Sequence, residues 1–264
     1  MSERFYGGRW SDAIKPSPFR IVPWLIFLVS IGLMIAWVLL TGDDRHPFTI
    51  GIVTTTALAV FVWSLRSNGP IWTFASFLTI FIFTYLLELI GVNTGIPFGQ
   101  YEYTDSLGFQ LADVPVVVPL AWYSMAIPTL MIARSLSKRK FIVVMMATIG
   151  LTAWDFLLDP WMVAEGHWVW QNPEPSLPGL TGIPITNFIG WLISTFLLFL
   201  ILDLFPRRRV IPLALPIAIY SWQWIGGAFS NLVFLDNSIV AFYVFFAMAL
   251  LAVPAIFTQY VKYR

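Results

Sequence analysis

The sequence contains no cysteine and only two histidines among its 264 residues. Without cysteine, the chain has no disulfide and no thiolate that acts as a nucleophile or a metal ligand. The two histidines match no four-ligand zinc spacing, and no glycine-rich loop of the kind that cradles phosphate is present. We therefore predict a protein that uses neither a metal nor a cofactor.

Charged residues are also scarce, at 11% of the chain, whereas hydrophobic residues make up 58% and the mean hydropathy is +0.79. This composition is typical of an integral membrane protein. We predict an all-α, polytopic helical bundle that forms a single membrane domain over residues 1–264. Eight apolar segments are long enough to cross a bilayer, and they cover residues 21–41, 47–65, 71–90, 114–134, 141–160, 188–205, 210–234 and 239–259.

Positive charge alternates between the two sides of the predicted bundle. Arg45 lies on one side, and the other 14 of the 15 Lys and Arg residues fall in the tail 1–20, the connections 66–70, 134–140 and 206–210, and the C-terminus. The positive-inside rule then predicts a protein of the cell membrane with both termini in the cytoplasm. This topology accounts for the Arg207–Arg209 triplet, so we predict no nucleic-acid binding.

The outer side of the predicted bundle has two long connections, residues 91–113 and 161–187. Both are rich in glycine, proline and aromatic residues, which favour tight turns over disorder. Both contain Thr-Gly-Ile-Pro, at 94–97 and 181–184, which indicates either an internal duplication or coincidence. We expect both connections to pack over the bundle as a lid or rim. Residues 71–205 then form the catalytic part, and the remaining spans are scaffold.

Two acidic residues, Asp155 and Asp159, lie one helical turn apart near the end of the fifth segment, so they share one helix face. A charged residue at mid-membrane costs about 2.5–3.5 kcal/mol, which makes such residues functional candidates. We expect the helix to end near Pro160, because proline interrupts the hydrogen-bond ladder. Burial, the helix dipole and the like charge then favour a pair that shares one proton. The alternative is a helix end that meets water at the membrane interface.

Three further polar residues are candidates for the site. Glu88 lies about one turn inside the third segment, on a side with no nearby Lys or Arg to neutralise it. Asp113 precedes the fourth segment and Asn187 begins the sixth, where either side chain could instead cap a helix.

Tryptophan is abundant in the outer half of the predicted bundle. An interfacial aromatic belt is one explanation. Around buried acids, however, the rings also form a low-dielectric box that stabilises a cation, by about 2 kcal/mol or more for a desolvated ring. The candidate substrate-binding residues are Trp122, Trp154, Trp161, Trp168, Trp170, Trp191, Tyr101, Tyr103, Asn187 and Asp113.

Buried acids among aromatic rings suit the protonation of an alkene in a lipid-like substrate. A carboxylic acid would protonate a trisubstituted terminal double bond, and the ring faces would hold the tertiary carbocation. Water activated by a second carboxylate would then capture the cation. The predicted catalytic residues are Asp155, Asp159 and Glu88.

Several stretches of the sequence resemble the carotenoid hydratase family of the CruF type. They are Glu88–Gly91, Thr94–Tyr103, Leu107–Gly108, Val114–Trp122, Trp154–Met162, Gly166–Trp170 and Gly182–Trp191, and the likeness covers residues 85–191. The resemblance implies hydration of the terminal 1,2 (or 1′,2′) double bond of an acyclic carotenoid end group. Its implied partners are the lipid bilayer, other carotenoid biosynthesis enzymes and a membrane-dissolved carotenoid, such as bisanhydrobacterioruberin, γ-carotene or lycopene.

Two other functions remain open. Asp155 and Asp159 resemble half of the Asp-rich magnesium motif of membrane prenyltransferases, although diphosphate binding needs a second motif and nearby basic residues. A proton-coupled transporter also carries acids in its membrane helices, and the paired Thr-Gly-Ile-Pro loops fit the internal repeats of such proteins.

Overall fold

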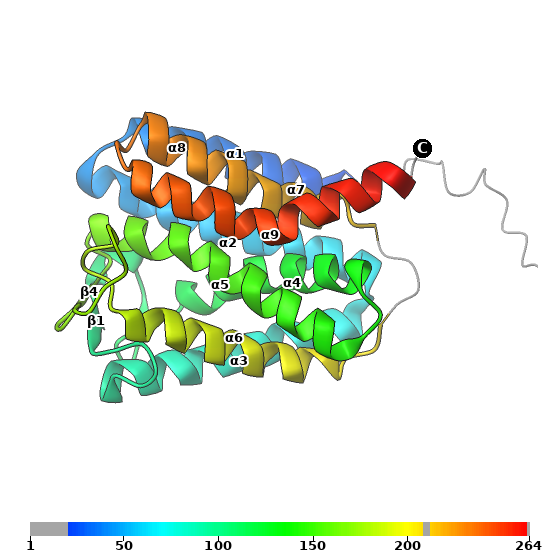
Figure 1. Ribbon diagram of the computed structural model, residues 1–264, viewed down its shortest axis with the longest axis horizontal. Helices are drawn as coiled ribbons and strands as arrows, with labels where there is room; N and C mark the ends of the chain where they lie inside the picture. The colour runs from blue at the N-terminus through cyan, green and yellow to red at the C-terminus, as the bar shows by residue number, and fades with distance from the viewer. Residues whose placement is uncertain (1–20, 208–211, 263–264) are drawn as a thin grey trace, which may run out of the picture.

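The protein is a bundle of long helices that run side by side, as a computed structural model shows for residues 21–207 and 212–262 (Figure 1). The predicted tail 1–20 and Arg208, Arg209 and Arg264 lie outside the described residues. The predicted all-α membrane bundle is confirmed. The long helices are α1 (Val22–Leu39), α2 (His46–Ser67), α3 (Pro70–Thr94), α4 (Val117–Leu136), α5 (Lys140–Ala164), α6 (Ile185–Asp203) and α9 (Ser238–Lys262).

These seven helices are each long and apolar enough to span a bilayer. The remaining predicted segment, 210–234, is also helical from Ala214 onward but is interrupted. It consists of α7 (Ala214–Ser221), the π-helix η5 (Trp222–Gly226) and α8 (Gly227–Val233), of eight, five and seven residues. A single π-turn inside an α-helix often marks a functional position, and η5 borders a cavity described below.

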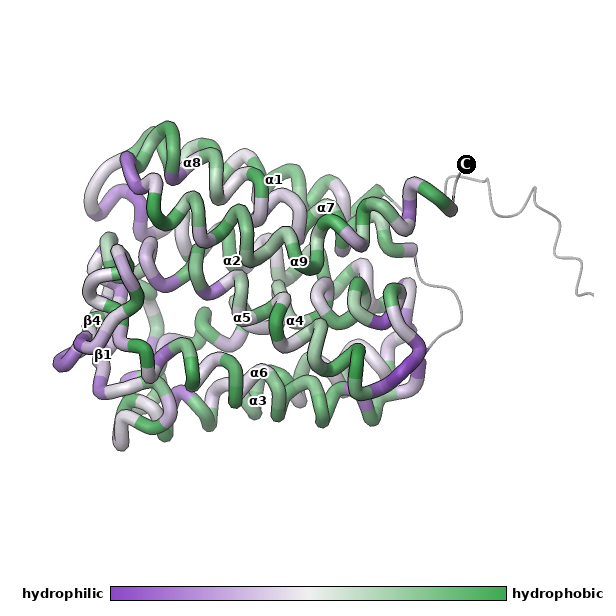
Figure 2. The backbone as a smooth tube through the Cα atoms, in the orientation of Figure 1, coloured by the Kyte–Doolittle hydropathy of each residue, from purple (hydrophilic) through white to green (hydrophobic). Residues whose placement is uncertain are grey.

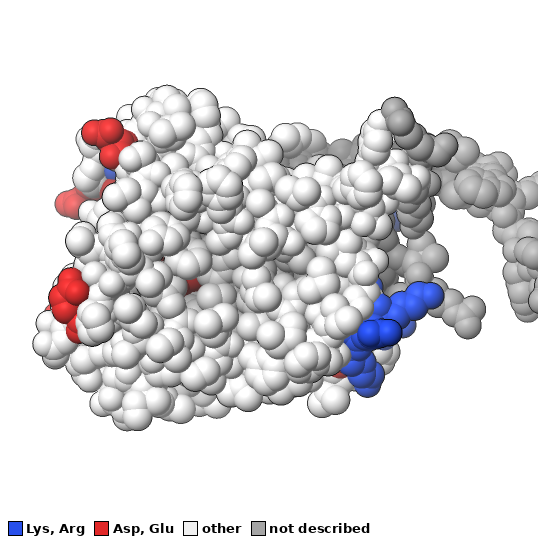
Figure 3. Space-filling view, viewed as in Figure 1, with Lys and Arg blue, Asp and Glu red and all other residues white. Residues whose placement is uncertain are grey.

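Hydropathy and charge both divide along the bundle axis. Apolar residues occupy the middle of the helices, and hydrophilic residues gather toward the ends (Figure 2). Lys and Arg side chains cluster at one end, whereas Asp and Glu side chains cluster at the other (Figure 3). The basic end includes the turn between α4 and α5, with Lys138, Arg139 and Lys140 exposed. The two long connections lie at the acidic end.

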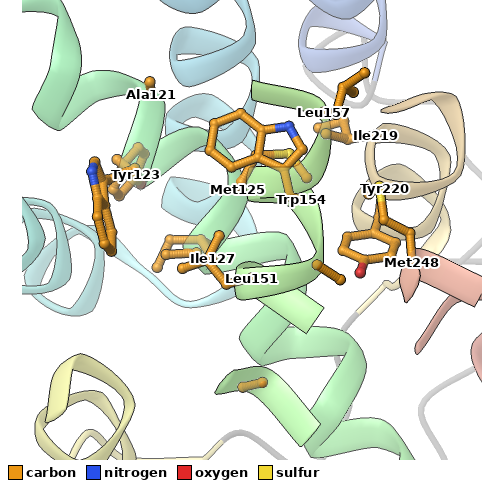
Figure 4. Packing of buried hydrophobic residues seen from close by; sticks show 14 of the residues in the cluster. Ala121, Tyr123, Met125, Ile127, Leu151, Trp154, Leu157, Ile219, Tyr220 and Met248 are labelled. Atoms are coloured by element: carbon orange, nitrogen blue, oxygen red, sulfur yellow. The ribbon is translucent and has the colours of Figure 1, made fainter. Parts of the chain in front are cut away.

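Helix α4 forms the centre of the bundle, because it packs against α2, α3, α5 and α7. Its side chains from Val117 to Ala133 are buried with one exception, Leu120, which is half-buried. Figure 4 shows Ile127 of α4 close to Leu151 of α5, and Met125 of α4 close to Trp154 of α5. The helices are also tied by polar contacts, such as the Tyr220 hydroxyl that donates to the Gly150 carbonyl at 2.8 Å.

The prediction that α5 ends near Pro160 is wrong. The helix continues through Pro160 to Ala164, since a proline costs one hydrogen bond and a bend without forcing a stop. The buried Met162 side chain follows the proline and anchors this last turn. Asp159 therefore lies more than one turn inside the helix, so the pair is not an exposed helix end.

The two long connections fold into a rim over the acidic end, as expected. Short strands β1 (Tyr101–Tyr103) and β4 (Trp168–Trp170) pair antiparallel and join the two connections. The first connection also contains the 3-10 helix η4 (Asp105–Leu107) and a hairpin of β2 (Gln110–Leu111) and β3 (Val114–Pro115). Another 3-10 helix, η3 (Gly42–Arg45), links α1 to α2.

Candidate active site

The two aspartates of α5 are joined by one amide from α6. The side-chain nitrogen of Asn187 donates to Oδ2 of Asp155 at 3.2 Å, and it also donates to Oδ2 of Asp159. All three side chains are at most 2% exposed. Asn187 does not cap α6, whose N-cap is Pro184. The i, i+4 spacing thus produced the predicted pair, and the amide holds both carboxyls at one place.

Glu88 of α3 is buried and accepts two phenol hydrogen bonds on the same oxygen. The hydroxyls of Tyr101 and Tyr103 donate to Oε2 of Glu88 at 2.5 Å and 2.9 Å. Alternate residues of a strand face the same side, so β1 presents both phenols to α3. Burial and the nearby Glu88 carboxylate raise the pKa of both tyrosines well above the ordinary value. Both phenols therefore remain donors, and Glu88 is held as an acceptor.

Gly91 makes this arrangement possible. It lies one turn after Glu88 on α3, under the ring of Tyr101. A Cβ atom at position 91 would lie 2.5 Å from the Tyr101 hydroxyl oxygen, which is closer than atoms approach without a shift. In the sequence, Gly91 stands at the start of the predicted connection 91–113. Its packing against Tyr101 could be recognised only once the structure placed that side chain.

A cavity of about 60 Å³ brings the acids together. Its lining includes Glu88, Asp159 and Asn187, but Asp155 lies behind Asp159 and does not line it. One water needs roughly 10–15 Å³ of such space, so the cavity has room for water beside the acids. Two separately predicted carboxyls, from α3 and α5, therefore face one small space.

Seven aromatic residues line the cavity. Trp122 and Trp191 are stacked with ring centroids 4.2 Å apart, and the aromatic lining is completed by Phe98, Tyr101, Tyr103, Trp168 and Trp170. The indole of Trp170 donates to the Phe98 carbonyl at 2.9 Å, which fixes the rim above the cavity. Ring faces so placed around a desolvated space attract a cation.

The other predicted residues lie elsewhere. Trp154 and Trp161 line a second, neighbouring cavity. Asp113 is exposed at the β2–β3 turn with a positive φ of 63°, and it caps no helix because the N-cap of α4 is Val116. Thr49 and Val53 of α2 line the acid cavity, although no polar pattern in that apolar span indicates it.

Two rim residues with ionisable side chains have structural partners. Arg45 forms an ion pair with Glu165 at 2.5 Å and lies 4.4 Å from the ring centre of Trp37. His167 is buried, and its Nδ1 hydrogen-bonds with the Ser106 hydroxyl at 2.6 Å. Burial, with a smaller contribution from His46, lowers the pKa of His167 to about 4. Within the described ranges, no three His, Asp and Glu side chains group as ligands of one metal ion.

The fold and the site define a polytopic helical membrane protein with an acid-lined, aromatic cavity. The chain belongs to the carotenoid biosynthesis protein family, whose profile matches residues 48–254. It is 31% identical over 129 residues to a bisanhydrobacterioruberin hydratase of Haloarcula japonica. That alignment covers 46% of this chain and 42% of the relative, so the chain matches less than half of the relative's length. No solved structure matches the chain.

Proposed function

We propose that this protein is a carotenoid hydratase, which adds water across the terminal 1,2 (1′,2′) double bond of an acyclic carotenoid end group. The observation that carries the proposal is that Asp159 and Glu88 line one cavity walled by aromatic rings. The name of the Haloarcula japonica relative supports the same reaction.

The proton donor in this mechanism is the aspartate pair. Two carboxyls that share one amide nitrogen repel each other when both are ionised, so the pair retains one proton. Asp159 faces the cavity and gives this proton to the less substituted alkene carbon. Asp155 acts through Asp159, because the two carboxyls meet at one amide and share the proton that Asp159 delivers.

Capture of the cation falls to Glu88. Protonation leaves a tertiary carbocation, which the rings of Trp122 and Trp191 stabilise. A water oxygen forms the new carbon–oxygen bond, and its released proton passes to Glu88. Tyr101 and Tyr103 hold the Glu88 oxygen in place for this step. The product is a tertiary alcohol, and the step requires neither a metal nor a cofactor.

Expression in a bacterium that makes lycopene or γ-carotene tests the proposal. We expect the extracted pigment to gain the mass of one water for each hydrated end, and the Asp159→Asn variant to leave the pigment unchanged. A gain of an isoprenoid unit would establish a prenyltransferase instead, and an unchanged pigment with the wild-type protein would favour a transporter. The engagement of Arg45 by Glu165 speaks against diphosphate binding at this end.

We also propose that the protein lies in the cell membrane with its basic end in the cytoplasm, and that residues 71–205 carry the chemistry. The charge separation in Figure 3 supports this orientation. Because the chain lacks cysteine, single cysteines report position cleanly. Asn172→Cys, in the outer connection, should react with an impermeant thiol reagent on intact cells, and Ser137→Cys, between α4 and α5, should not. The reverse pattern would invert the topology.

A further inference from the structure

A second cavity, of about 400 Å³, lies next to the acid cavity. It is bounded by α1, α2, α4, α5 and the η5–α8 segment, and most of its lining is apolar. Sites that hold small ligands typically measure about 300–1,000 Å³. The acid cavity, at about 60 Å³, is well below that size. It accommodates a reacting end group with water, whereas a long chain needs further space.

The two cavities adjoin each other. Five residues line both of them, namely Thr49, Val53, Ala121, Leu158 and Met162. In Figure 4, Trp154, which lines the second cavity, lies close to Met125 of α4. The second cavity therefore lies next to the space that Asp159 lines.

The hydroxyl groups in the wall of the second cavity are already paired, whereas the Gln223 amide makes only a long contact with the Met34 sulfur, at 4.0 Å. The Thr49 hydroxyl accepts from the Trp37 indole at 3.0 Å and donates to the Arg45 carbonyl at 3.1 Å. The hydroxyls of Ser124 and Ser230 donate to carbonyls of their own helices at 2.7 Å and 3.0 Å. Such a wall gives a polar ligand little to bind and suits an apolar chain.

The second cavity reaches the lipid-facing surface between α1 and α8. Leu39 on α1 and Phe229 on α8 line it and are 69% and 56% exposed. Next to the cavity, the Trp222 indole contacts the Met34 sulfur at 3.0 Å and closes the gap between α1 and η5. At the other end, Trp37 stacks on Trp161 with centroids 5.1 Å apart. These two contacts join α1 to η5 and to α5, and the exposed lining residues lie on α1 and α8.

We propose that this second cavity binds the polyene chain of the carotenoid, which enters sideways from the bilayer between α1 and α8. The inference rests on the proposed hydration for the identity of the ligand. It adds the entry route and the residues that select a long chain. It also gives the π-helix a role, because η5 supplies Trp222, Gln223 and Gly226 to the wall.

Gly226 offers a way to fill the cavity without disturbing the backbone. A Cβ atom there would meet only the Trp222 ring, at 3.5 Å or more, which is ordinary contact. The side chain of Gly226→Phe would then occupy space that the polyene needs. Gly32→Phe on α1 is the matched control, because a Cβ at exposed Gly32 meets nothing within 4 Å. Ile35→Trp, at the half-exposed mouth, provides a second blocking variant.

Binding and turnover are measured separately. In an Asp159→Asn background, which does not hydrate, we expect lycopene to copurify with the protein and with the Gly32→Phe version. We expect about tenfold less lycopene, or none, with Gly226→Phe or Ile35→Trp. In the active background, the same blocking variants should lose kcat/KM for lycopene by about tenfold or more. They should retain kcat/KM for geranyl methyl ether, a short isoprenoid with the same trisubstituted end.

Folded yield in detergent accompanies each measurement, and Ile35→Trp decides the question should Gly226→Phe fail to fold. Copurification at the wild-type level in folded blocking variants would overturn the proposed chain site. A wild-type protein that binds lycopene in this blockable manner but never hydrates it would refute the hydratase proposal and leave the chain site standing.

Discussion

Replacing Asp159 by asparagine is the sharpest test of the proposed chemistry. The variant retains nearly the same shape, and the new amide oxygen still accepts from Asn187, which holds position 159 in the wild type. What it loses is the acidic proton at the cavity wall. General acid catalysis contributes about 10²–10⁴ in rate, which equals roughly 3–5 kcal/mol of barrier. We therefore expect hydration of lycopene to fall by about that factor in Asp159→Asn.

The neighbouring substitution, Asp155→Asn, should have a smaller effect. Asp155 does not line the cavity and reaches the reaction through Asp159 and Asn187. Its loss removes the carboxyl that shares the proton with Asp159, so we expect a decrease of about 10–100-fold. The effects of the two substitutions should be non-additive, because residues in one hydrogen-bonded network are coupled.

The assay measures hydroxylated carotenoid formed by detergent-purified protein, together with folded yield and heat stability. Both variants should fold, because a neutral amide is cheaper to bury than a charged carboxylate. Near wild-type hydration by both variants would refute the acid role of the pair. A large loss in Asp155→Asn with an active Asp159→Asn would reverse the assignment of the two residues.

Three further predictions follow from the contacts around the site. Glu88→Gln should slow the capture of the cation by water. Substrate recovered from heavy water should then carry deuterium at its terminal alkene, and little alcohol should form. Undeuterated substrate with a normal yield of alcohol would contradict this prediction. Gly91→Ala should displace the Tyr101 phenol from Glu88 and reduce kcat by about tenfold or more. The control variant Gly32→Ala should retain its kcat. Equal activity of the two variants would argue against a role for the Gly91–Tyr101 contact. The pKa of His167 is about 4 in the folded protein and about 6.5 in the unfolded chain. The unfolded chain therefore binds the proton first as the pH falls, so stability should decrease between about pH 6.5 and pH 4. Thermal unfolding in detergent should show a weaker decrease for His167→Gln.

The sequence was sufficient for the bundle and for part of the site. Apolar runs and charge alternation predict the spans because lipid contact imposes both, and helical spacing places Asp155 and Asp159 on one face. The π-turn at Trp222–Gly226 has no comparable sequence pattern, since its residues other than Gln223 are apolar or glycine. The continuation of α5 past Pro160 depends on tertiary packing of the turn that follows, which outweighs the local preference of proline to stop a helix.

The partners of the acids were less predictable than the acids themselves. Glu88 is separated from Tyr101 by a loop, and their contact arises because β1 pairs with β4 across two connections far apart in the sequence. Three-residue strands are too short for alternation alone to identify. The same limit applies to Asn187, whose position at the start of α6 suggested a cap. Its actual role requires the relative rotation of α5 and α6, which the sequence pattern leaves undefined.

The placement of Asp159 and Glu88 around one cavity also determines how the catalyst resets. One turnover moves a proton from Asp159 to the substrate and another from water to Glu88, so the sum of alkene and water to alcohol neither consumes nor releases protons. Restoring the starting state needs only a transfer between two groups that border the same space. A transmembrane proton gradient would then add no driving force. The relative free energies of alkene and alcohol would set the direction, and the same residues would eliminate water from the alcohol when it accumulates.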